Sequence, residues 1–105
     1  MDDMVRDIAL DFKNKVRAVI GDKFSALILY GSCARGDNIG GSDIDLLLLL
    51  RDTLTPLEEE QLAVIKSEQS LACDTLLSCF PYPEEAWSSW QTPFLSNVRN
   101  EGVQL

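Results

Sequence analysis

An α/β fold is the prediction from this 105-residue sequence, and three observations carry it. An amphipathic helical pattern occupies residues 4–20, two aliphatic stretches follow at residues 25–30 and 43–50, and a second, capped helical pattern begins at residue 56. Helix-like and strand-like segments alternate along the chain, as they do where a sheet packs against helices. The length predicts one domain, residues 1–105, with a core large enough to fold without disulfides.

The first helix is predicted from apolar residues at helical spacing: Met4, Val5, Ile8, Phe12, Val16, Val19 and Ile20. Asp2 or Asp3 caps its start and Gly21 ends it. A second helix is expected from about Pro56 to Glu68, because Thr55 to Glu58 form a capping box with proline at the first helical position. We expect packing roles for both helices, with the glutamates of the second helix's first turn in solvent.

The remainder of the chain predicts one strand and two short helices. The strand carries Asp74, and Phe80 to Pro83 follow as a rigid loop. Helical stretches are expected near Glu84 to Trp90 and Pro93 to Asn100. Trp87, Trp90 and Phe94 would share one face if this region were a continuous helix, and they form either part of the core or a docking surface.

A pair of carboxylates stands at the start of the second strand. Because side chains alternate along a strand, Asp43 and Asp45 project from one face. There they repel each other and lose hydration unless a cation or a proton compensates. Magnesium is typically held by one or two carboxylates together with substrate phosphates, so the pair predicts a magnesium site.

A phosphate-binding turn precedes that pair. Gly31 allows close approach of the backbone to a ligand, and the N–H groups of residues 32–35 at a helix start favour an anion. Ser32 can donate to a phosphate oxygen, and Arg35 can pair with the phosphate through two hydrogen bonds. Gly-Ser can be only a turn and Asp-x-Asp only a loop cap, but the two at one fixed spacing arise by chance in roughly one chain in several hundred. The combination predicts a nucleoside triphosphate bound with magnesium.

Composition narrows the chemistry further. The chain has no histidine, which excludes Ser-His-Asp catalysis, Cys-His catalysis and histidine-based zinc sites. A net charge of −8 argues against direct binding of nucleic acid and favours a basic or neutral protein partner.

The three cysteines, Cys33, Cys73 and Cys79, form no Cys-x-x-Cys pair and indicate a reducing cytoplasm. Cys73 and Cys79 are expected as core thiols on the strand that carries Asp74, on the face opposite that residue. The sequence has neither a leader-like start nor an apolar run of membrane-spanning length, so a cytoplasmic protein is expected.

The spacing of Gly31-Ser32, ten intervening residues and Asp43-Ile44-Asp45 resembles the signature of the nucleotidyltransferase superfamily related to DNA polymerase beta. Within it, residues 31–49 resemble the minimal nucleotidyltransferases (MNT), small prokaryotic proteins often paired with a HEPN-domain partner. Asp74 matches a third carboxylate that the family carries on a later strand, and residues 92–103 are similar to the family's C-terminal segment. The resemblance implies the polymerase beta-like fold, a small mixed β-sheet flanked by helices.

The resemblance also implies nucleotidyl transfer from ATP. Asp43 and Asp45 would hold two magnesium ions, and Asp74 would complete the metal site and take the acceptor proton. Ser32, the backbone near it and Arg35 would hold the β- and γ-phosphates. The chain has no room for a nucleic-acid or drug-binding domain, so the acceptor is expected to supply its own binding surface.

The family suggests as acceptor a HEPN-type ribonuclease toxin, modified with AMP on a tyrosine or similar hydroxyl, which would make this protein an antitoxin. Two alternatives remain at this point. One is a binding module that neutralises its partner by stoichiometric contact, and the other is a small-molecule nucleotidyltransferase that builds its acceptor pocket by dimerising. The sequence leaves the choice between a homo-oligomer and a hetero-oligomer open.

Overall fold

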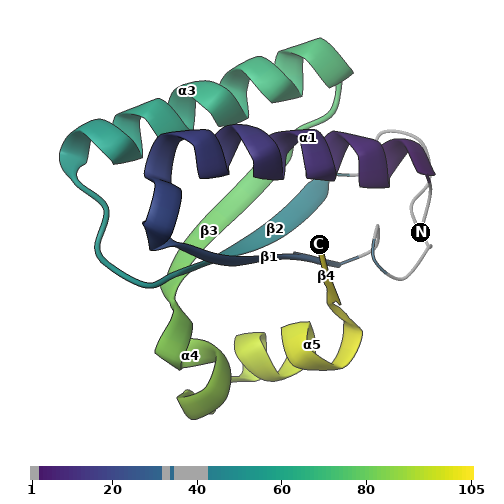
Figure 1. Ribbon diagram of the computed structural model, residues 1–105. Coiled ribbons are helices and arrows are strands. Elements are labelled where there is room, and N and C mark those ends of the chain that lie inside the picture. The colour runs from purple at the N-terminus through teal and green to yellow at the C-terminus, as the bar shows by residue number, and fades with distance from the viewer. Residues whose placement is uncertain (1–2, 32–33, 35–42) are drawn as a thin grey trace.

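The computed structural model describes residues 3–31, residue 34 and residues 43–105. The elements in chain order are α1 (Asp3–Ile20), the 3₁₀ turn η1 (Gly21–Lys23), β1 (Phe24–Tyr30), β2 (Ile44–Leu50), α3 (Pro56–Cys73), β3 (Leu77–Pro83), α4 (Glu84–Ser89), α5 (Pro93–Glu101) and β4 (Val103–Gln104). The strands form a four-stranded sheet in the order β3-β2-β1-β4. Helices α1 and α3 cover one face, and α4 and α5 lie against the other (Figure 1). The mixed α/β architecture is therefore confirmed.

The central strand β2 is buried on both sides of the sheet. Leu46 and Leu48 pack in the core beneath α1 and α3, whereas Leu47 and Leu49 pack with residues of α4 and α5. Strand β2 runs antiparallel to β1 and parallel to β3. A strand covered on both faces is a continuous apolar run, which explains the row of leucines after Asp45.

The first helix forms as predicted. Its apolar stripe faces the sheet, with Phe12 and Val16 fully buried. The helix ends at Ile20, and Gly21 follows with φ +57°, a conformation that glycine adopts without a steric penalty. The strand expected at residues 25–30 then begins at Phe24.

The capping box at the start of α3 is also confirmed. The Thr55 N–H donates to Oε1 of Glu58 at 2.9 Å, and the Glu58 N–H donates to Oγ1 of Thr55 at 3.1 Å. Lys23 donates to the same Glu58 oxygen at 2.6 Å and links the helix to the start of β1. The helix continues to Cys73, past the predicted end at Glu68, because Gln69 is buried against α1 and accepts a hydrogen bond from Lys15 at 2.7 Å.

Two predictions for the segment after α3 are wrong. Asp74 does not lie on a strand: it ends α3 in the left-handed conformation, with φ 51°, and β3 begins only at Leu77. Phe80 to Pro83 are not a loop but the second half of β3, paired with Leu47 to Leu50 of β2. Pro81 and Pro83 are tolerated in β3 because it is an edge strand, paired on one side only.

The prediction that Cys73 and Cys79 share a strand is also wrong, because α3 is longer than expected. Cys73 is the last residue of α3, so it does not share a strand face with Cys79. Both residues are partly exposed rather than fully buried. Burial still raises the pKa of the Cys79 thiol to about 12, which keeps it protonated at neutral pH. Cys33 lies outside the described residues.

The two short helices are confirmed as α4 and α5. They do not form one continuous helix, because Trp90 has an extended backbone after α4 and Thr92 starts a new cap, its side chain accepting from the Leu95 N–H at 3.2 Å. Within the described part of the chain, no helix has the length and apolar character needed to cross a membrane.

Replacing Thr55 by alanine is expected to lower the free energy of unfolding by about 1 kcal/mol, because the Glu58 N–H at the start of α3 loses its acceptor. Urea denaturation measures this change. Thr53→Ala is the matched control, since Thr53 is exposed and its hydrogen bond to Asp52 uses the backbone N–H. Equal losses in both variants would contradict a role for the cap.

Candidate active site

The carboxylate pair predicted from the sequence lies at one end of the two central strands. Asp43 immediately precedes β2, and Asp45 is the second residue of that strand. In the sheet, Asp45 is opposite Tyr30 of β1 and opposite Ser78 of β3. By the alternation along β2, the Asp45 side chain is on the face that α4 and α5 cover, beside Leu47.

Gly31 brings the end of β1 against the Asp45 carboxylate. Its φ of +78° is a conformation that residues with a Cβ rarely adopt. A Cβ built on Gly31 would stand 2.8 Å from Oδ2 of Asp45, closer than real Cβ contacts allow. Glycine at this position therefore allows the turn and leaves room for the Asp45 carboxylate.

The electrostatics of the pair favour a cation. Asp45 is half-buried, and burial first, followed by the charge of Asp43, raises the pKa of its carboxyl group. Burial also raises the pKa of Tyr30 to about 12, with a further contribution from the charge of Asp45. A bound cation would offset both the burial and the repulsion, and a set of oxygen ligands suits magnesium.

The predicted third carboxylate stands apart from this pair. Asp74 is exposed at the end of α3, where its backbone N–H contacts the carbonyls of Ser70 and Leu71. Because β2 and β3 are parallel with Ile44 opposite Leu77, Asp74 and Asp43 both lie at the end of the sheet where these two strands begin. Among the residues that the structure describes, however, no three histidine, cysteine or acidic side chains come together as a metal-binding group. The role of Asp74 stays a prediction.

The residues predicted to contact phosphate, Ser32 and Arg35, and the connection at residues 38–41 lie outside the described residues. Ala34 is helical and packs partly buried against the core beneath α1 and α3. Of the predicted site, the structure thus positions Gly31, Asp43 and Asp45 together.

The fold adds two neighbours that sequence reasoning did not assign to the site, Tyr30 and Ser78. Tyr30 is the last residue of β1, and its position next to the glycine turn was a usable signal. Ser78 comes beside Asp45 only through the parallel pairing of β3 with β2. No local pattern in the sequence predicts that pairing.

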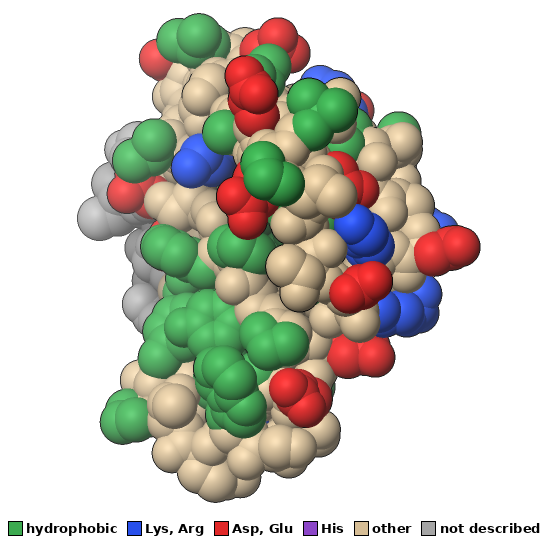
Figure 2. Space-filling view, turned by 90° about the vertical axis from the view of Figure 1, so that its left-hand side faces the viewer, with side chains coloured by type: hydrophobic (Ala, Val, Ile, Leu, Met, Phe, Trp, Pro, Cys, Tyr) green, Lys and Arg blue, Asp and Glu red, His purple; other side chains and the backbone are tan. Residues whose placement is uncertain are grey.

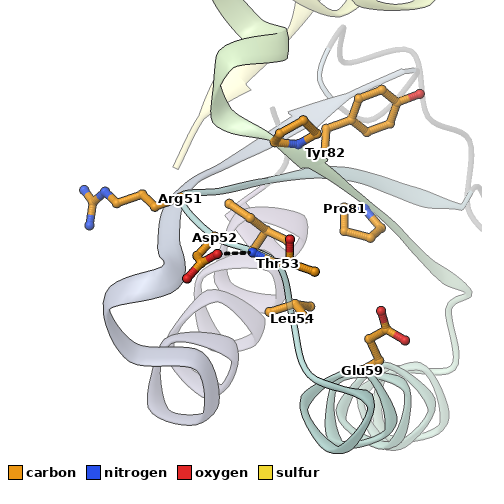
Figure 3. A pocket seen from close by; sticks show the side chains of 9 residues that line it. Arg51, Asp52, Thr53, Leu54, Glu59, Pro81 and Tyr82 are labelled. Carbon is orange, nitrogen blue, oxygen red and sulfur yellow. Dashed lines mark hydrogen bonds between the residues drawn. The ribbon is translucent and has the colours of Figure 1, made fainter.

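A separate cleft of about 390 Å³ lies at the far end of the same strands. It is formed by the chain leaving β2, by α3 and by the end of β3, and Arg51, Asp52, Glu59 and Tyr82 are among its lining residues. In Figure 3, the Arg51 side chain points away from the cleft, and Asp52 accepts a hydrogen bond from the Thr53 N–H. None of the predicted site residues lines this cleft, so it is not the candidate active site.

Comparison with known proteins identifies the family. Residues 11–97 match the family described as the nucleotidyltransferase domain. The chain belongs to this family. The match spans both strands that carry the candidate site, and this member of the family is therefore a nucleotidyltransferase.

A sequence relative supports the same assignment. A protein of Methanocaldococcus jannaschii, named "Putative protein adenylyltransferase MJ0141", is 34% identical over 99 residues, which cover 94% of this chain and 96% of that protein.

Solved structures share the fold of this nucleotidyltransferase at lower identity. A toxin-antitoxin structure with AMP-PNP matches with a TM-score of 0.63 and 22% identity, over 90% of this chain and 69% of that one. An MNT antitoxin in complex with a tri-AMPylated HEPN toxin of Shewanella oneidensis matches with a TM-score of 0.62 and 20% identity, over 95% and 70% of the respective chains.

Gly31→Ala is expected to weaken the binding of magnesium with a nucleoside triphosphate analogue by about tenfold, because the new methyl group displaces the Asp45 carboxylate. Gly21→Ala is the matched control: Gly21 also has positive φ, but a Cβ there meets nothing within 4 Å. Both variants should lose roughly 1–2 kcal/mol of stability from backbone strain. Calorimetric titration measures binding, and equal affinities in the two variants would contradict the proposed contact.

Proposed function

We propose that this nucleotidyltransferase transfers AMP from ATP to a hydroxyl group of a partner protein, and that the partner is a HEPN-type toxin for which it is the antitoxin. The observation that carries the proposal is the joining of Asp43 and Asp45 with the Gly31 turn in a member of the nucleotidyltransferase family. The name of the M. jannaschii relative supports protein adenylylation, and the toxin-antitoxin neighbours support the partner.

Magnesium fits the residues present. Asp43 and Asp45 offer carboxylate oxygens in a place where burial and mutual repulsion disfavour two uncompensated charges. We propose two ions held by Asp43 and Asp45, with Asp74 as a further ligand that moves toward the pair on binding, since the three carboxylates do not come together in the structure. Bound magnesium supplies positive charge to the triphosphate and orients it for in-line attack.

The chain's own residues position the reactants. Ser32, the backbone of the Gly31 turn and Arg35 hold the β- and γ-phosphates in this proposal. The acceptor oxygen forms a bond to the α-phosphorus, and the bond from the α-phosphorus to pyrophosphate breaks. The proton of the acceptor hydroxyl passes to Asp74, whose exposure leaves it within reach of a docked partner. Positioning and charge neutralisation supply most of the catalysis.

The surface charge agrees with a protein acceptor. A net charge of −8 disfavours a nucleic-acid substrate and favours a partner that is basic or neutral where it docks. We propose a cytoplasmic location, where ATP and magnesium are available, and action as one domain of residues 1–105. Whether the active assembly is a homo-oligomer or a hetero-oligomer follows from how the partner binds.

The double variant Asp43→Asn, Asp45→Asn tests the function. The product of the neighbouring gene, which in this proposal is the HEPN-type toxin, is incubated with ATP, magnesium and either the wild type or the variant, and its intact mass is measured. A gain of one or more AMP units with the wild type alone is the expected result, since the variant loses the charges that hold magnesium.

Retained complex formation by the double variant, measured by gel filtration, shows that it has folded. If the wild type forms a stable complex but adds no mass, the protein acts by stoichiometric contact and the proposed transfer is wrong. If AMP appears on a small molecule without any partner protein, the acceptor class is wrong.

A further inference from the structure

Four aromatic side chains form a connected group, which we call the aromatic surface: Phe80, Tyr82, Trp90 and Phe94. Tyr82 stacks on Phe94 with ring centroids 5.8 Å apart and meets Trp90 edge-on at 6.0 Å, and Phe80 meets Phe94 at 6.5 Å. Phe80 is 46% exposed and Trp90 is 41% exposed. Large aromatics that stay accessible after folding are typical of docking surfaces.

The surface occupies the face of the edge strand β3 on the side of α4 and α5, the residue that follows α4 and the start of α5. The end of β3 and α4 lie at the lower left of Figure 1. In Figure 2, which views the molecule from that side, hydrophobic side chains gather in the lower part of the face. Trp90 and Phe94 follow α4, and β3 supplies Phe80 and Tyr82.

The aromatic surface is continuous with the candidate active site. Phe94 meets the ring of Tyr30 edge-on at 5.4 Å, and Tyr30 is opposite Asp45 in the sheet. On the other side of Asp45, Phe80 follows the paired residue Ser78 by two positions and shares its face. Two residues along a strand span about 7 Å. A partner seated on Phe80 therefore reaches the carboxylate pair with a single side chain.

The surface is held rigid by Arg99 of α5. Its guanidinium donates to the carbonyls of Trp87 at 2.7 Å, Ala86 at 2.9 Å and Trp90 at 2.6 Å, which satisfies the end of α4. It also lies over the Trp87 ring at 5.6 Å. Trp87 is thus partly buried beneath Arg99, while Trp90 is fixed by its backbone and left accessible. Preorganised aromatic anchors lose little entropy when a partner binds.

We propose that the aromatic surface is the docking site of the acceptor protein, which presents an apolar segment beside the hydroxyl that receives AMP and basic residues around it. This inference rests on the proposed function and names where that partner binds. The group of four rings is larger than one nucleobase needs.

Charge complementarity favours a basic acceptor protein over a second copy of this chain as the occupant of the aromatic surface. Glu84 and Glu85 begin α4 directly after β3, both exposed, and Asp43 lies at the other end of the neighbouring strand, also exposed. A second copy would bring the same acidic groups, whereas a basic rim on the acceptor is complementary.

The double variant Phe80→Ser, Trp90→Ser tests the proposal. It is expected to weaken binding of the HEPN-type protein, measured by calorimetry, by about a hundredfold, because both anchors are lost. AMP transfer should fall at low partner concentration and recover at saturation, an effect on KM rather than kcat. Magnesium-dependent binding of AMP-PNP should equal that of the wild type.

The matched control is Leu57→Ser, Leu71→Ser. These leucines are 63% and 84% exposed on α3, which covers the opposite face of the sheet. The control is expected to bind the partner and to transfer AMP as the wild type does. Circular dichroism of both double variants checks that each is folded.

Three results would overturn the proposal: unchanged partner affinity in the Phe80, Trp90 variant, an equal loss in the leucine control, or a loss of AMP-PNP binding, which would make the surface a site for the nucleobase. The affinity measurement does not depend on AMP transfer. If the wild type binds the partner but adds no AMP, the proposed transfer fails while the docking site is still tested; if the wild type does not bind the partner, the docking proposal fails.

Discussion

The contact between the Gly31 backbone and the Asp45 carboxylate is the constraint on which the candidate site depends. It exists because β1 and β2 are antiparallel, with Tyr30 opposite Asp45, so that the chain leaving β1 turns at the point where the second carboxylate emerges. A Cβ on residue 31 would stand 2.8 Å from Oδ2 of Asp45, so the carboxylate would have to shift. One glycine therefore determines both the path of the turn and the orientation of a charged group.

The surrounding sheet holds that arrangement rigid and raises the electrostatic cost of an ionised Asp45. Leucines bury β2 on both faces, so Asp45 is held by a strand that has little freedom to move. The same burial raises the pKa of Asp45, and the charge of Asp43 adds to the effect. A half-buried carboxylate beside a second, exposed one is costly for folding and useful for binding a cation. The family assignment gives this cost a functional explanation.

The candidate active site and the proposed docking surface lie on the same face of the sheet. Asp45, Tyr30, Phe80 and Phe94 belong to a connected set on the side of α4 and α5, whereas α1 and α3 cover the other side. A nucleotidyltransferase gains specificity for its acceptor if the docking surface for that acceptor adjoins the reacting groups. Arg99 contributes from a distance, since it fixes the end of α4 and hence Trp90.

The sequence by itself determined the local structure: the helix that ends just before Gly21, the capping box at Thr55, the two aliphatic strands and the carboxylate pair with its glycine. Each depends on neighbouring residues, through spacing, caps or alternation. The tertiary structure alone decided that Asp74 ends a helix instead of lying on a strand, that Phe80 to Pro83 pair with β2, and that Ser78 lies beside Asp45. These features depend on parallel pairing across the long α3 connection, where burial against α1 extends the helix and delays the strand, and no local pattern encodes such distant contacts.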